Sequence, residues 1–176
     1  DVPPVPLHSG AELLAACKNS EVREAMRLLG IEGIDVNAKA ADGYPSYQYG
    51  MTPLHFACEK GHTEVAFALA ANEAVNVNAK DKYGNTPLLS ACWFGHKELA
   101  LALVAHEAVD VNAKNKEGKT PLHYACEKGL KEVALALAAN KAVDVNAKAK
   151  NGWTPLHFAC DEGHTEVALA LVANEA

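Results

Sequence analysis

The chain has 176 residues, of which 49% are hydrophobic and 22% charged, so it can fold around a core rather than remain disordered. Its formal net charge of −6, without a basic cluster, argues against a nucleic-acid partner, because phosphate binding depends on clustered Lys and Arg. No apolar run approaches the roughly 18 residues of a membrane span, and the N-terminal residues lack a signal-peptide pattern, so we expect no membrane insertion.

The chain opens on a proline-rich stretch, which predicts a stiff linker or tail over residues 1–10. Residues 11–39 then predict two short helices and form the first of five related segments. The second of these helices carries Arg23, Glu24 and Arg27 where the later segments carry apolar residues or alanine. A polar outer helix is what the terminal unit of a stack requires, so this segment is expected to cap the N-terminal end.

Residues 40–50 are an insertion between the first two segments. Aligning Cys17 with Cys58 brings the Val-Asn-Ala-Lys sequences of the two segments into register at an offset of 41 residues, whereas the later segments repeat every 34. The insertion contains three tyrosines, Tyr44, Tyr47 and Tyr49. Tyrosines offer rigid amphipathic area at low entropic cost, which predicts a second contact region for a partner. The alternative is that the finger folds back on the groove.

Four further segments follow, at about 50–80, 84–114, 118–148 and 152–176. Each contains Thr-Pro-Leu, at Thr52, Thr86, Thr120 and Thr154. Thr can cap free backbone N–H groups and Pro is tolerated at the first helical position, so a helix begins there. A glycine ends this helix, a second helix rich in Ala, Leu and Val follows, and turn-forming residues connect to the next segment. One such unit cannot bury its apolar face, but stacked units can.

This order of turn, Thr-Pro-Leu-His, two helices and Val-Asn-Ala resembles the ankyrin repeat family from about Ala11 to the end. The resemblance implies an all-α repeat solenoid of helix-turn-helix units with projecting β-hairpin or turn fingers. It also implies a protein–protein interaction scaffold that binds its partner on the concave groove and hairpin tips. The alternative is a targeting or autoinhibitory domain of a larger enzyme or channel. The chain departs from the family in its spacing, 34 rather than about 33 residues, and in Leu89, which replaces a histidine.

The cysteines and histidines follow the repeat, which argues against chemistry at these positions. Five cysteines occupy one equivalent position per segment, where equivalent atoms should lie roughly 10 Å apart, too far for disulfides. We therefore expect each of the five cysteines to be buried as a small hydrophobic side chain. We also expect a reducing compartment, either cytoplasmic or nuclear. Histidines three residues before a cysteine are spread along the stack, so no metal site is expected. An active site is a unique constellation, so repetition also predicts no catalysis and no cofactor.

The residues without copies in other segments are the candidates for partner binding. Directly after the cysteine, three segments carry charges, whereas the third carries Trp93 and Phe94. In the ankyrin family these positions lie on the concave face, and residues flanking the hairpin glycine lie nearby. The predicted partner-binding residues are Tyr83, Asn85, Trp93, Phe94, Lys119 and Trp153, together with the three finger tyrosines. The alternative is that Trp93 and Phe94 pack onto the adjacent repeat. Four residues are expected to be half-buried between repeats: Phe56, Ser90, Tyr124 and Phe158.

The last expected helix, residues 167–173, is as apolar as the internal ones and lacks the polar outer face of the first segment. A solvated apolar end is unfavourable, so we expect that further repeats follow in a longer protein or that another molecule covers this end.

Overall fold

The computed structural model describes residues 9–41 and 43–174, so nearly all of the proline-rich tail lies outside it. Within these residues the chain forms ten α-helices and no β-strand, which confirms an all-α solenoid. The helices pair as α1 (Gly10–Lys18) with α2 (Val22–Leu29), α3 (Pro53–Lys60) with α4 (Thr63–Ala70), α5 (Pro87–Trp93) with α6 (Lys97–Val104), α7 (Pro121–Glu127) with α8 (Lys131–Ala139), and α9 (Pro155–Asp161) with α10 (Thr165–Asn174). The inserted finger contains a short 3-10 helix, η1 (Ser46–Gln48).

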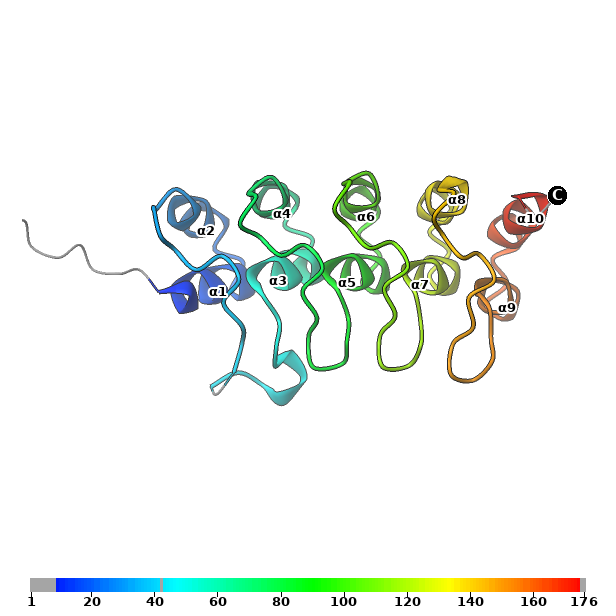
Figure 1. The fold of residues 1–176 in the computed structure, drawn as a ribbon, viewed down its shortest axis with the longest axis horizontal. Coiled ribbons are helices and arrows are strands. Elements are labelled where there is room, and N and C mark those ends of the chain that lie inside the picture. The colour runs from blue at the N-terminus through cyan, green and yellow to red at the C-terminus, as the bar shows by residue number, and fades with distance from the viewer. Residues whose placement is uncertain (1–8, 42, 175–176) are drawn as a thin grey trace, which may run out of the picture.

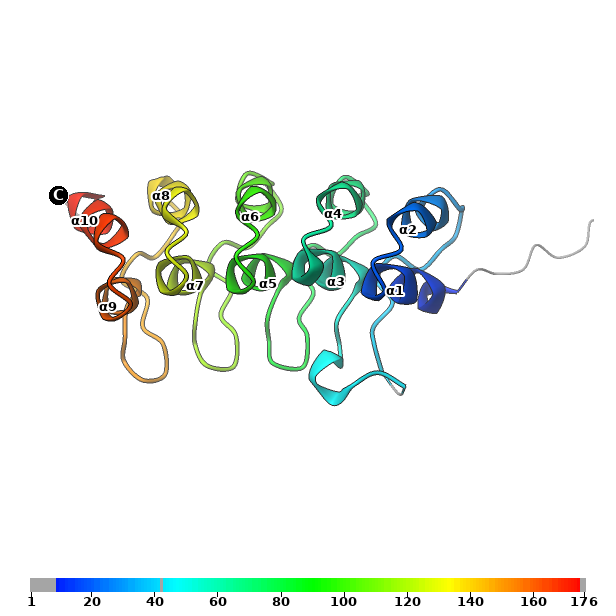
Figure 2. The same ribbon diagram turned by 180° about the vertical axis from the view of Figure 1, so that it is seen from behind.

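The helices form two parallel rows. The first helix of each pair lies in one row and the second in another, and the fingers project from the side of the first row that faces away from the second (Figure 1). The opposite view shows the same two rows and the same regular step (Figure 2). Each first helix packs against the next first helix, and each second helix against the next second helix, as in a stack whose units contact only their neighbours.

In the second and fourth repeats, the histidine after Thr-Pro-Leu joins the first helix to the following finger. In the second repeat the backbone N–H of Thr52 donates to Nδ1 of His55 at 3.1 Å, so the ring proton must lie on Nε2. This Nε2–H donates to the Asn85 carbonyl, 30 residues further along the chain, at 2.9 Å. In the same way His123 reaches the Trp153 carbonyl at 3.2 Å. In the third repeat Leu89 takes this place and is fully buried in the core.

The fingers are tight turns that hydrogen-bond to one another. The second finger is closed by the Asp81 N–H, which donates to the Asn85 carbonyl at 3.0 Å. Its Lys82 N–H donates to the Tyr49 carbonyl of the inserted finger at 2.9 Å, and equivalent bonds tie the later fingers together. The row of fingers is therefore a connected surface rather than a set of independent loops.

Two expectations about burial need correction. Cys17, Cys58, Cys92 and Cys126 are buried free thiols, but Cys160 is exposed. The described chain contains no following repeat that could cover this side of α9. Burial raises the pKa of the Cys92 thiol to about 12, so it stays protonated as a small hydrophobic group. The four residues expected to be half-buried between repeats are instead buried, because each is covered by the neighbouring unit: Phe56, Ser90, Tyr124 and Phe158.

Candidate partner-binding groove

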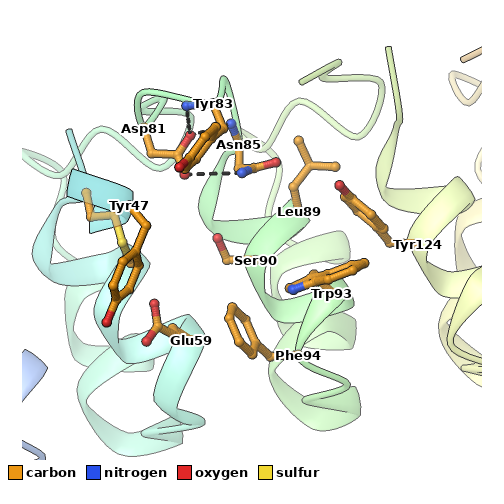
Figure 3. Close-up of a pocket in the computed structure, with 11 residues that line it drawn as sticks. Tyr47, Glu59, Asp81, Tyr83, Asn85, Leu89, Ser90, Trp93, Phe94 and Tyr124 are labelled. Atoms are coloured by element: carbon orange, nitrogen blue, oxygen red, sulfur yellow. Dashed lines mark hydrogen bonds between the residues drawn. The ribbon is translucent and has the colours of Figure 1, made fainter. Parts of the chain in front are cut away.

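Five of the nine predicted binding residues line one pocket of about 200 Å³ between the fingers and the first-helix row. These are Tyr47, Tyr83, Asn85, Trp93 and Phe94 (Figure 3). The remaining lining residues are Met51, Glu59, Asp81, Leu89, Ser90 and Tyr124. We call this site the groove pocket. Its walls come from the inserted finger, the second finger and helices α3, α5 and α7, so it exists only because the repeats stack.

Trp93 and Phe94 lie where α5 ends and remain accessible, at 42% and 49% exposed. Trp93 packs edge-on against Tyr124, with ring centroids 5.1 Å apart and an interplanar angle of 64°. The Lys128 Nζ lies 3.9 Å from the centroid of the Trp93 ring. Trp93 therefore packs partly onto the adjacent repeat, and its neighbours fix its orientation. Much of the Trp93 and Phe94 side chains nevertheless remains open to solvent.

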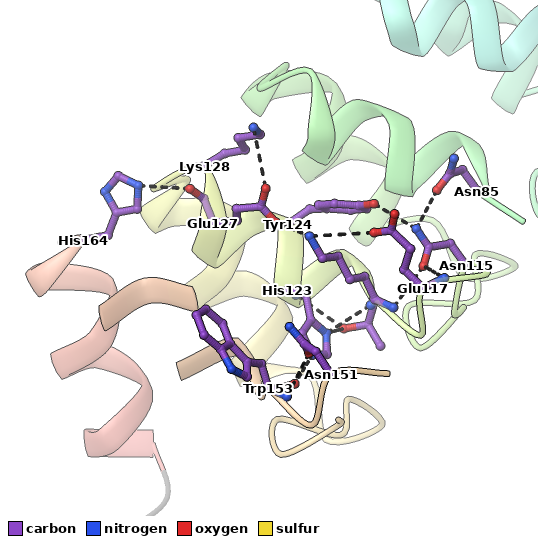
Figure 4. Close-up of polar contacts among 12 residues, drawn as sticks. Asn85, Asn115, Glu117, His123, Tyr124, Glu127, Lys128, Asn151, Trp153 and His164 are labelled. Atoms are coloured by element: carbon purple, nitrogen blue, oxygen red, sulfur yellow. Dashed lines mark hydrogen bonds and ion pairs between the residues drawn. The ribbon is translucent and has the colours of Figure 1, made fainter. Parts of the chain in front are cut away.

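The second finger is held rigid by Asp81. Its Oδ1 accepts hydrogen bonds from the backbone N–H groups of Tyr83 and Asn85, both at 2.8 Å. From the next finger, the Asn115 amide donates to Asn85 Oδ1 at 3.0 Å and to the Tyr124 hydroxyl at 2.8 Å (Figure 4). Tyr83 is therefore presented on a preorganised turn, which lowers the entropic cost of binding.

The three finger tyrosines have different environments. Tyr44 is half-buried, with its ring 5.9 Å from that of Phe56, and burial raises the pKa of its hydroxyl. Tyr49 is also half-buried. Tyr47 lies in η1, is 58% exposed and faces the groove pocket. Tyr44 thus packs onto the row of first helices at Phe56, whereas Tyr47 remains exposed beside the groove pocket.

Lys119 and Trp153 lie outside the groove pocket. The Lys119 Nζ is 2.7 Å from a Glu127 carboxylate oxygen and 4.6 Å from the centroid of the Phe158 ring, so it ties its finger to α7 and α9. Trp153 packs edge-on against Phe158, with ring centroids 5.1 Å apart, and lines a separate hollow at the C-terminal end. The predicted binding residues that do line the groove pocket therefore come from the inserted finger, the second finger and the end of α5.

Sequence reasoning did not assign a binding role to Glu59, Asp81 or Tyr124. Glu59 occupies the same repeat position as Trp93, so the comparison that singled out Trp93 could also have paired the two. Asp81 lies among the turn-forming residues of a finger and Tyr124 lies between repeats, so only the stacked structure brings them to one pocket.

Across residues 9–41 and 43–174, no three His, Cys, Asp or Glu side chains come together in a way that could hold a metal ion. None of its helices has the length and apolar character needed to cross a membrane.

Two comparisons with known proteins bear on the fold. A family model described as ankyrin repeats, in three copies, matches residues 13–115 and 107–176. A search of curated proteins finds no significant match.

Proposed function

The chain belongs to the ankyrin repeat family, and we propose that it is a protein–protein interaction scaffold that holds its partner in the groove pocket and against the finger tips. Ankyrin repeats are in general protein–protein interaction modules. The observation that carries the proposal is the gathering of four exposed aromatic side chains around one pocket: Tyr47, Tyr83, Trp93 and Phe94. The free cysteines support a reducing compartment, the cytoplasm or the nucleus.

Exposed aromatic side chains in a preformed pocket are the usual anchors of protein interfaces. Tyr and Trp are enriched among residues whose truncation costs about 2 kcal/mol or more of binding energy. The equivalent positions in neighbouring repeats carry Glu59-Lys60 and Glu127-Lys128, which shows that the fold does not itself require aromatic residues there. Their presence in the third repeat is therefore better explained by a partner than by stability.

Trp93→Ala and Phe94→Ala are each expected to weaken partner binding by about 30-fold, the equivalent of about 2 kcal/mol. Phe67→Ala is the matched control, because Phe67 is 45% exposed but lies on α4, in the row of helices away from the fingers. Affinity capture with the wild type and the three variants gives the partner, and thermal unfolding checks that all remain folded. If Phe67→Ala abolished partner binding while the other two variants kept it, the interface would lie on the row of second helices instead.

We also propose that a further ankyrin-type repeat packs against α9 and α10. Cys160 and His157 are exposed, whereas their counterparts Cys126 and His123 are buried by the following repeat. His157 already has the geometry of an internal repeat, because the Thr154 N–H donates to its Nδ1 at 3.3 Å. Val172 on α10 is exposed as well. These are the residues that a next unit would cover.

The genomic reading frame tests this second proposal. Another Thr-Pro-Leu-His sequence 34 residues beyond Thr154 is the expected finding, since that is the period of the internal repeats. A stop codon directly after residue 176, together with a monomeric protein in solution, would contradict it.

A further inference from the structure

We propose that the groove pocket receives a single basic side chain of the partner, preferably an arginine, between Tyr47 and Phe94 and above the Glu59 carboxylate. This inference rests on the proposed scaffold function and names the chemistry that its pocket recognises. Both of the charged residues that line the pocket, Glu59 and Asp81, are acidic. A cation would therefore meet negative charge inside the pocket, and an acidic side chain would be repelled.

The aromatic walls favour a cation. Tyr47 from the finger and Phe94 at the end of α5 lie on either side of Glu59 (Figure 3). A cation is attracted to the electron-rich face of an aromatic ring, and the planar guanidinium of arginine can also stack on such a face. A neighbouring ring of the pocket already contacts a cation of the same chain, because the Lys82 Nζ lies 4.8 Å from the centroid of the Tyr83 ring. In the described chain no lysine is seen over Tyr47 or Phe94.

Glu59 is placed to bind the charge. Its side chain is only 13% exposed, and one of its oxygens lies 3.0 Å from the Nζ of Lys60, whose side chain is 38% exposed. Lys60 is the more exposed partner of this pair, so a guanidinium that arrives from solvent can share the Glu59 carboxylate with it. Asp81 is different, because its oxygens accept from the N–H groups of its own finger. Asp81 therefore contributes negative charge and rigidity rather than a direct contact.

The size and rim of the pocket limit the partner to one basic residue. A volume of about 200 Å³ is smaller than the roughly 300–1,000 Å³ of small-molecule sites and suits a single side chain. Outside the pocket, Lys60 pairs with Glu59, Lys82 lies over Tyr83 and Lys128 lies over Trp93. These lysines would repel a polybasic segment. The fitting partner is thus a segment with one arginine flanked by uncharged or acidic residues.

A displayed library of random peptides, selected on the wild-type domain, tests the inference. We expect the recovered peptides to share one arginine or lysine, and a synthetic peptide to lose affinity about ten-fold or more when this residue is replaced by methionine. Glu59→Gln should weaken the same peptide about ten-fold, because it removes the charge and keeps the shape. Asp161→Asn is the matched control, since Asp161 holds the same repeat position in a different hollow.

The outcomes separate this inference from the scaffold proposal. Peptides that require Trp93 and Phe94 but share an apolar or acidic residue, and that bind Glu59→Gln as well as the wild type, would overturn the basic-residue inference alone. Selected peptides that bind equally well after Trp93→Ala and Phe94→Ala would count against the groove pocket as the binding site, and so against both.

Discussion

Gly61→Ala is expected to lower the free energy of unfolding by about 3 kcal/mol or more, whereas Gly95→Ala should lower it by only about 1–2 kcal/mol. Both glycines follow a first helix with a left-handed backbone, at φ 71° and 78°, so both variants carry the same backbone strain. A Cβ at Gly61 would lie 2.6 Å from the His96 ring, whereas nothing lies within 4 Å of one at Gly95. The difference arises because Leu130 replaces this histidine in the following repeat.

The His96 ring cannot move aside freely, because its Nε2 is hydrogen-bonded to the Glu59 carbonyl at 2.9 Å. Gly61→Ala therefore costs either a steric clash or this contact between repeats. Equilibrium unfolding in urea measures the loss, and a double-mutant cycle with His96→Leu isolates the clash. The two changes should couple by about 1 kcal/mol or more, with the double variant recovering stability. Equal losses for Gly61→Ala and Gly95→Ala would show that the ring yields at no cost.

The fold could be predicted from the sequence because its determinants are local and repeated. Each Thr-Pro pair starts a helix, each following glycine ends it, and the constant period requires the units to stack. The burial of individual residues was harder to predict from the sequence. Cys160 has the sequence context of Cys126, yet one is exposed and the other buried, because burial depends on the next repeat rather than on the segment itself.

The groove pocket could be predicted only in part. Comparison of the repeats singled out Trp93 and Phe94 because they replace charged residues. It also grouped Trp153 with Tyr83, although Tyr83 precedes its hairpin glycine and Trp153 follows its own, so the two do not occupy equivalent places. The proximity of Tyr47 and Glu59 depends on the path of the inserted finger, which has no counterpart in the other repeats.

Acidification from pH 7.5 to pH 5.5 is expected to destabilise the domain through two buried histidines, His55 and His123. Burial is the main cause that lowers the pKa of each ring, and both nitrogens of each are engaged by the neutral form. An unfolded histidine titrates near pH 6.5, so just below that pH the unfolded state binds more protons than the folded state. The stabilisation is complete above about pH 6.5 and is lost as the pH falls toward the folded-state values, at up to about 1.4 kcal/mol per pH unit for each ring.

The double variant His55→Leu/His123→Leu should flatten this pH dependence. Leucine fits the position, because Leu89 is fully buried there in the third repeat and its N–H still donates to the Thr86 hydroxyl at 3.4 Å. His157→Leu removes the same helix-capping contact, but from a histidine that is exposed. This variant should keep the wild-type dependence of stability on pH. Urea unfolding at several pH values measures all three proteins. A double variant as acid-sensitive as the wild type would assign the effect to other groups, of which His62 is the first candidate, because burial and the nearby Lys60 also lower its pKa.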